Sequence, residues 1–135
     1  MIKPVCKDIF FLSQKSVPAA KEDLPVCRDL ADTLAAHEDC IGMAANMIGV
    51  NKNIIAVKAG RGCLVLLNPV ILSKSGPYDV REGCLSLPGM RKTVRYAKIT
   101  VEFQDKNFKK RRQTFSGLDA QVIQHEIDHL SGILI

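Results

Sequence analysis

Residues 124–130 of the chain, Q-H-E-I-D-H-L, contain the pattern H-E-x-x-H, whose residue types suit metal chemistry. On a helix, His125 and His129 lie one turn apart and project from the same face. Their ring nitrogens can therefore bind one metal ion, each at about 2.0–2.1 Å. Glu126, beside the first histidine, can reach a water molecule on that metal and act as a general base. The pattern predicts metal-assisted hydrolysis.

A five-residue pattern also arises by chance, and the alternative is a pair of exposed histidines that share no ligand. Leu118 and Val122 favour the metal site, because they continue the helical stripe of His125 and His129 and predict that both histidines face the apolar core. Two inward histidines need partners, and one metal ion would satisfy both. The remaining histidine, His37, is expected to be exposed near the end of another helix.

A tetrahedral metal held by two histidines needs a third protein ligand and an open position for water. Only Leu130–Ile135 follow the second histidine, and they offer no strong side-chain ligand, so the third ligand is expected upstream. Cys84, in the segment E-G-C-L-S, is the candidate, because Gly83 allows close backbone approach and a thiolate suits a borderline metal. Taken alone, Cys84 is better interpreted as a buried thiol.

The composition is that of an ordinary soluble globular protein. With 135 residues, 47% hydrophobic and 24% charged, the chain fits a single domain over residues 1–135. No apolar run approaches the roughly 18 residues of a membrane span. The N-terminus lacks the apolar stretch and cleavage site of a signal peptide. These features predict a cytoplasmic protein.

The five cysteines are odd in number and scattered, without a C-x-x-C pair. Such a set is a poor disulfide framework and suits a reducing compartment. Apart from Cys84, the cysteines are expected to be small buried hydrophobic residues; these four are Cys6, Cys27, Cys40 and Cys63.

Two segments in the first half of the chain have recognisable patterns. Residues 23–37 are predicted to form an amphipathic helix, with Asp23 as its cap and Pro25 in the first turn, where a missing N–H does no harm. Residues 41–50, I-G-M-A-A-N-M-I-G-V, are small and apolar with two glycines. They indicate buried, closely approached backbone rather than a surface loop.

Short apolar runs predict the strands. Residues 54–57 and 63–67 are expected to pair, with the Asn68-Pro69 dipeptide ending or bending the second strand. Residues 99–104 alternate between apolar and polar, as a half-buried strand does, and a turn would return the chain over 110–115 as a hairpin.

The last predicted element is a helix over about 117–130. Ser116 and Asp119 resemble a capping box at its start, and Gly132 supplies a stop. Strands precede this helix without βαβ alternation. We therefore predict an α+β fold, with mostly antiparallel sheets packed around the C-terminal H-E-x-x-H helix.

The net charge is +5, and the densest basic run is Lys109–Arg112. We interpret the run as a solvated strand face. It would give weak attraction to ribosomal RNA at most, because no aromatic stacking pattern accompanies it. Specific nucleic-acid binding is not expected.

Three segments in this order resemble the peptide deformylase family: the glycine–alanine segment at 42–50, E-G-C-L-S at 82–86 and Q-H-E-I-D-H-L at 124–130. The second and third match the family motifs without a substitution, and together they are highly specific. Weaker similarity covers most of the chain, including residues 88–91 and the hairpin from Ile99.

The resemblance implies a metal-dependent hydrolase that removes the formyl group from the N-terminal formyl-methionine of new bacterial polypeptides. It assigns Cys84, His125 and His129 to one divalent metal ion and Glu126 to general acid and base catalysis. Leu85 would donate its backbone N–H to the developing oxyanion. The native metal of the family is usually ferrous iron, Fe(2+), often replaced by zinc, nickel or cobalt in preparations.

The resemblance also implies how the substrate binds. Its backbone would pair with residues around Ile41, Gly42 and Leu85 as an added strand, and its methionine side chain would enter an apolar pocket with Val122 in the wall. The expected partners are the formyl-methionine N-termini of nascent peptides, with transient ribosome contact and no membrane. The chain ends at Ile135, without the C-terminal extension of many members, so ribosome contact through that extension stays open.

The first motif departs from the family pattern G-x-G-x-A-A-x-Q, because Cys40 replaces the first glycine and Met47 replaces the glutamine. In the family this glutamine donates a hydrogen bond to the formyl oxygen, which a thioether cannot do. Loss of one oxyanion donor typically costs about 10²–10³ in rate. We expect a slower enzyme unless a neighbour substitutes, and Asn46 would do so only if the backbone rotated it inward.

Three interpretations remain open from the sequence. The first is a working deformylase. The second is a divergent metal-dependent amidase acting on another small acyl substrate, which Met47 supports. The third is a catalytically weakened metal- or peptide-binding protein, against which Glu126 argues, because a structural metal site needs no carboxylate beside its ligand. A metalloprotease is disfavoured by the upstream third ligand.

Overall fold

The chain folds around one antiparallel sheet, which a computed structural model describes over residues 1–135. The sheet has five strands in the order β1-β2-β3-β4-β5, so strands that are neighbours in space are also neighbours in sequence. The elements in chain order are α1 (Ile9–Leu12), η1 (Lys21–Asp23), α2 (Leu24–Ala36), β1 (Gly42–Ala44), η2 (Ala45–Ile48), β2 (Ile54–Ala59), β3 (Gly62–Cys84), β4 (Leu87–Gln104), β5 (Lys110–Ser116) and α3 (Gly117–Leu130), where η marks a 3₁₀-helix. This arrangement confirms the predicted α+β class.

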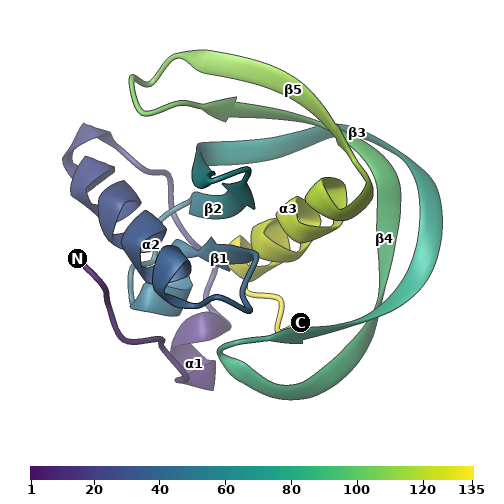
Figure 1. Ribbon diagram of the computed structural model, residues 1–135, viewed down its shortest axis with the longest axis horizontal. Coiled ribbons are helices and arrows are strands. Elements are labelled where there is room, and N and C mark those ends of the chain that lie inside the picture. The colour runs from purple at the N-terminus through teal and green to yellow at the C-terminus, as the bar shows by residue number, and fades with distance from the viewer.

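The C-terminal helix α3 lies in the middle of the molecule, and the β3–β4 ribbon curls around it (Figure 1). One cluster of 24 buried hydrophobic residues draws members from α2, α3 and all five strands. Leu30 and Leu34 of α2 and Ile123 of α3 are fully buried in this cluster. The core therefore fixes the helix that carries the two histidines from several sides.

The β3–β4 ribbon is longer than the sequence predicted. Strand β3 has 23 residues and β4 has 18, and they meet in a two-residue turn formed by Leu85 and Ser86. The prediction that Asn68-Pro69 bends the strand is correct, because Asn68 has φ of 51° and the register shifts between Leu67 and Val70. The strand does not end there. Much of the ribbon beyond this bend is exposed, so it lacks the apolar runs that mark a buried strand.

The predicted helices are present, but several details differ. Asp23 stands at the N-cap position of α2, yet its carboxylate accepts a hydrogen bond from the Ala20 nitrogen instead. Ser116 makes no side-chain cap to α3, so the predicted capping box is wrong. Leu118 is 60% exposed, which corrects the expectation that it shares the buried stripe with the histidines, because it lies in the first turn of α3. Gly132, with φ of 79°, follows the helix end as predicted.

All five cysteines are free, as the sequence predicted. Only Cys27 is buried, however, and Cys6, Cys40 and Cys63 are half-buried, so the expectation that these three are buried is wrong, although Cys40 and Cys63 pack against the core. None of the helices combines the length and apolar character needed to cross a membrane.

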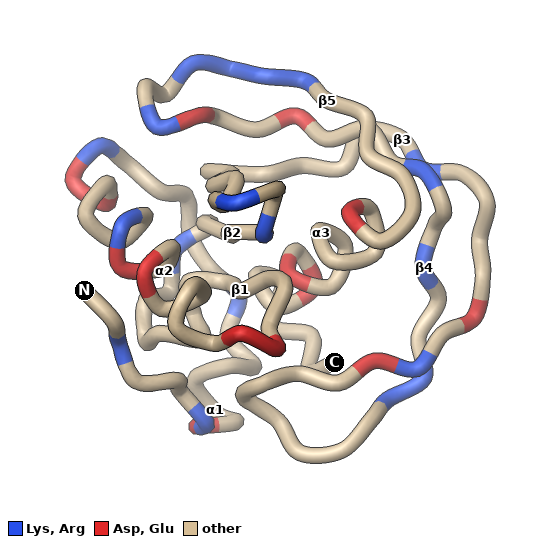
Figure 2. The backbone as a smooth tube through the Cα atoms, viewed as in Figure 1, with Lys and Arg blue, Asp and Glu red and all other residues tan.

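The basic run Lys109–Arg112 forms a continuous stretch along β5 (Figure 2). All of its residues are exposed, as expected of a solvated strand face. Glu102 and Asp105 pair with three of the four cations, which reduces the charge that the strand presents. The run is therefore a solvent-exposed strand face, as the sequence indicated.

Candidate active site

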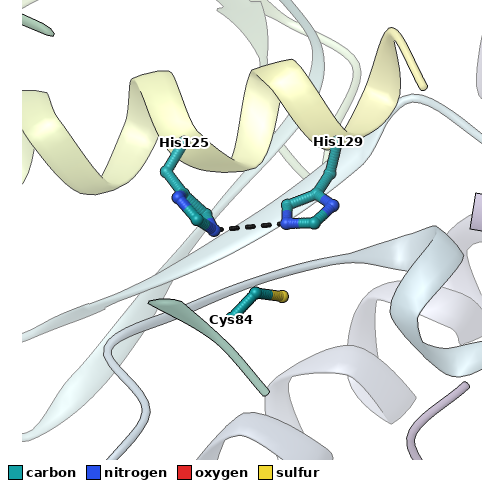
Figure 3. A group of neighbouring side chains, drawn as sticks. All are labelled: Cys84, His125 and His129. Carbon is teal, nitrogen blue, oxygen red and sulfur yellow. Dashed lines mark hydrogen bonds between the residues drawn. The ribbon is translucent and has the colours of Figure 1, made fainter. Parts of the chain in front are cut away.

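Three side chains that the sequence singled out as metal ligands converge at one point. One ligand atom from each of Cys84, His125 and His129 lies within 4.8 Å of the others. Both rings leave the same side of α3 and face Cys84, which the β3–β4 turn brings beneath them (Figure 3). Cys84 therefore lies upstream of the histidines in the sequence, and the tip of the β3–β4 hairpin brings it close to them in space.

The two histidines have the separation that a shared metal ion requires. Their Nε2 atoms lie 3.2 Å apart. Two ligands bound at 2.0–2.1 Å with tetrahedral geometry are about 3.3 Å apart. A set of three protein ligands, here one thiolate and two imidazoles, leaves the fourth position open, as in catalytic metal sites. The residues present therefore fit a divalent metal ion.

The pKa values of His125 and His129 differ because the surroundings of the two rings differ. Burial lowers the pKa of His129 to about 4. Burial also acts to lower the pKa of His125, but hydrogen bonds to Cys84 and Glu82 outweigh it and raise that pKa to about 10. A metal ion held by His125 and His129 would replace any proton shared between the two rings.

Glu82 orients the first histidine, and sequence reasoning did not assign it this role. Its Oε1 atom lies 2.8 Å from Nδ1 of His125, which directs the Nε2 atom toward Cys84. Burial acts to raise the pKa of Glu82, but hydrogen bonds from His125 and Arg95 lower it to about 2, so it stays a carboxylate. Carboxylate–histidine pairs of this kind fix the ring and its tautomer at metal sites. The signal was available, since Glu82 belongs to the segment E-G-C-L-S.

Glu126 is a buried carboxylate at the wall of the cavity. It is 4% exposed, and its Oε1 atom has no hydrogen-bond partner. Burial raises its pKa to about 7, although the positive charge of His125 opposes this. A carboxyl group with a pKa near the working pH can both accept and release a proton.

A cavity of about 870 Å³ opens beside these groups. Half of its lining, 10 of 21 residues, is hydrophobic. His129 does not line it and is fully buried. The sequence-predicted residues that do line it are Ile41, Gly42, Met47, Cys84, Leu85, Val122, His125 and Glu126.

Strand β1 borders the cavity as the open edge of the sheet, with β2 on its other side. The carbonyl of Ile41 accepts a hydrogen bond from the Lys58 nitrogen, so Ile41 faces β2. Backbone groups alternate along a strand, and Gly42 therefore points its own groups away from β2, toward the open edge. The Cys40 thiol donates to the Gly42 carbonyl at 2.9 Å.

The segment after β1 shows how Met47 and Asn46 are used. Met47 is 1% exposed, and its sulfur accepts a hydrogen bond from the Ala44 nitrogen. The side-chain amide of Asn46 donates to the backbone carbonyl of His129 at 2.8 Å. Asn46 is therefore committed to α3 and does not supply the donor that Met47 lacks.

Comparisons with known proteins point to one family. A family model described as polypeptide deformylase matches residues 4–135. A peptide deformylase of Clostridium beijerinckii is 54% identical over 136 residues, which cover 100% of both chains. A peptide deformylase of Desulfitobacterium hafniense is 39% identical over 127 residues, covering 91% of this chain and 84% of the relative.

Solved structures show the same fold. The peptide deformylase of Thermotoga maritima superposes with a TM-score of 0.90 at 28% identity, over 99% of this chain and 95% of that one. A Met-Ala-Ser-bound class I type b peptide deformylase of Acinetobacter baumannii superposes with a TM-score of 0.89 at 26% identity, over 99% and 97%. Because the family model spans nearly the whole sequence and a relative is 54% identical end to end, the chain belongs to the polypeptide deformylase family.

Proposed function

We propose that Cys84, His125 and His129 hold a divalent metal ion with which this deformylase removes the formyl group from N-terminal formyl-methionine. Peptide deformylation is the activity of the family, and the chain is an enzyme of that class. The observation that carries the site assignment is the 3.2 Å separation of the two Nε2 atoms opposite Cys84. When bound, the ion supplies Lewis acidity that activates water and polarises the formyl carbonyl. The proposed ion is ferrous iron, Fe(2+), and a mixed thiolate and imidazole set also suits zinc, nickel or cobalt.

Glu126 is proposed as the proton carrier. Its unpartnered Oε1 takes a proton from the attacking water as the C–O bond to the formyl carbon forms. The same group then delivers the proton to the departing amine nitrogen as the C–N bond breaks. The products are formate and a free N-terminal amine. Burial supports this role, because a carboxyl group with a pKa of about 7 gives and takes a proton at similar cost near neutral pH.

Leu85 is proposed as the donor to the developing oxyanion. It sits in the β3–β4 turn directly after Cys84, and no turn or loop hydrogen bond of the backbone uses its amide. An amide fixed in this way stabilises negative charge as it develops, without reorganisation during the reaction.

The substrate is proposed to add to β1 as a further strand. Gly42 supplies the open backbone edge, while Ile41 and Val122 contribute side chains to the cavity. Support comes from the Acinetobacter baumannii structure, which has Met-Ala-Ser bound. Nascent N-termini are then the partners, with transient ribosome contact, and the proposed location is the cytoplasm, where such chains are made.

A second candidate function is hydrolysis of a different small acyl amide at the same centre. Met47 favours it, because a site without the glutamine donor has lost one feature that selects a formyl oxygen. Acetyl in place of formyl is the simplest such substrate. Both candidates share the same ligands and the same role for Glu126.

Formate release from a formyl-Met-Ala-Ser peptide by iron-loaded protein tests the proposal, with Glu126→Ala and an acetyl-Met-Ala-Ser peptide alongside. We expect release that falls about 10²–10⁴-fold in the variant. Release of acetate in preference to formate would favour the second candidate. A protein that binds iron stoichiometrically and hydrolyses neither peptide would overturn both.

A further inference from the structure

Arg95 occupies an unusual place for an arginine, because it is 3% exposed in the interior of the molecule. From β4, its Nε and Nη2 atoms donate to the carboxylate of Glu82 at 3.0 and 2.7 Å. Its Nη1 atom donates to Asp128 at 2.5 Å. One guanidinium thus binds two carboxylates that come from different elements.

The two carboxylates belong to the segments that carry the proposed ligands. Glu82 lies on β3, two residues before Cys84, and Asp128 lies on α3, directly before His129. Arg95 therefore joins the hairpin of the cysteine to the helix of the histidines. No other side chain makes ion pairs to both elements.

Glu82, which Arg95 holds in place, in turn contacts His125. Besides Arg95, its carboxylate accepts from Gln121 at 2.9 Å and contacts Nδ1 of His125 at 2.8 Å. With both oxygens used, the carboxylate has one orientation available. The ring of His125 then has one orientation as well.

Stability alone is a weak reason for this arrangement. Desolvation of a buried guanidinium and carboxylate nearly cancels their attraction, and apolar replacements are often equally stable. The forked geometry of arginine, however, holds two carboxylates at fixed angles, which the point charge of a lysine does not. The contacts of Arg95 therefore do more to fix the relative positions of Glu82 and Asp128 than to stabilise the fold.

We propose that Arg95 is a positioning residue that sets the affinity of the Cys84–His125–His129 site for a divalent metal ion. It does so by holding Glu82 and Asp128, and through them the hairpin and the helix, in one relative placement. The inference rests on the proposed function, since it takes these three residues as the ligands.

The test is a chelator competition that measures the dissociation constant for Co²⁺ in wild type, Arg95→Lys and Ile99→Val, with the Co²⁺ absorption spectrum as a report on ligand geometry. Ile99→Val is the matched control, because it removes a methylene from the core of the same strand without touching the network. We expect Arg95→Lys to weaken binding about 10- to 100-fold and to change the spectrum. Ile99→Val is expected to lower the melting temperature while leaving the affinity unchanged.

Asp128→Asn keeps the result decisive if Arg95→Lys fails to fold. Asp128→Asn removes the negative charge that Arg95 contacts on α3 and is expected to weaken Co²⁺ binding several-fold. Because Arg95 acts through Glu82, the double variant Arg95→Lys with Glu82→Gln should bind no more weakly than the weaker single variant.

The outcomes separate the two proposals. Wild type that binds no Co²⁺ overturns the metal site and with it the proposed function. Wild type that binds Co²⁺ while Arg95→Lys and Asp128→Asn bind it equally tightly overturns the role of Arg95 alone. Equal loss of affinity in Ile99→Val would show that the effect follows general stability, and would overturn it too.

Discussion

The thioether sulfur of Met47 lies 3.4 Å from the backbone nitrogen of Ala44 and accepts its hydrogen bond. The family pattern has glutamine at this position, which carries both an acceptor and a donor. Methionine retains an acceptor for Ala44 and supplies no donor toward the cavity. Met47 would therefore keep the contact to Ala44 but lack the donor to the formyl oxygen that the family pattern implies.

Met47→Gln is expected to raise kcat. The new carbonyl can accept from Ala44, and the new NH₂ group can reach the oxyanion, a donor typically worth about 10²–10³ in rate. Met47→Leu is the control, because it has a similar volume and neither group. Steady-state deformylation of a formyl-Met peptide measures both. An unchanged or lower rate in Met47→Gln would show that the missing donor at position 47 does not limit the rate.

The sequence predicted the site better than the scaffold that holds it. The convergence of the two histidines with Cys84 was predictable because a metal site has narrow chemical requirements and, in H-E-x-x-H, a spacing set by the helix. Strand 54–57 was found because all of its residues are apolar and buried, and strand 99–104 because buried and partly exposed residues alternate along it. The H-E-x-x-H spacing and the apolar patterns of the strands are both local features of the sequence.

The parts that were missed depend on tertiary contacts. The β3–β4 ribbon between Asn68 and Arg95 is largely exposed, so no buried alternation marks it as a strand. Arg95 itself gave no signal, because burial of an arginine is decided by partners that come from other elements, here Glu82 and Asp128. Leu118 fits the helical stripe, yet its position in the first turn leaves it at the cavity mouth.

Gly42→Ala is expected to lower kcat/KM about 10- to 100-fold. A Cβ atom at this position would clash with Cγ1 of Val122 and lie 3.1 Å from Oε2 of Glu126, so the α3 side chains or the two elements must shift. Displacement of a catalytic group by about 1 Å can cost 10² in rate. Gly62→Ala is the matched control, since nothing lies within 4 Å of its Cβ position.

The double variant Gly42→Ala with Val122→Ala tests the cause. Removing the side chain that the new methyl group meets should recover most of the lost activity. Failure to recover would mean that the glycine is needed for a reason other than its approach to α3.

Removal of the metal is expected to lower the melting temperature by about 10 °C. At free metal about one hundred times the dissociation constant, binding stabilises the native state by about 2.7 kcal/mol. For a chain of this size, each kcal/mol corresponds to about 4 °C. Calorimetry with and without a chelator measures the difference. Cys84→Ala should melt at the same temperature in both conditions, and an equal response to the chelator would count against Cys84 as a ligand.

Cys40→Ala is expected to lower KM for a formyl-Met peptide about two- to fivefold. The Cys40 thiol now donates to the carbonyl of Gly42, which is the β1 acceptor facing the open edge. A substrate strand that pairs with β1 must share or displace that donor, and a net hydrogen bond is worth about 1 kcal/mol. Cys40→Ser keeps a hydroxyl donor and should leave KM close to that of wild type. The contrast between alanine and serine separates the hydrogen bond from the size of the side chain, and equal KM values in all three proteins would show that the substrate does not use the Gly42 carbonyl.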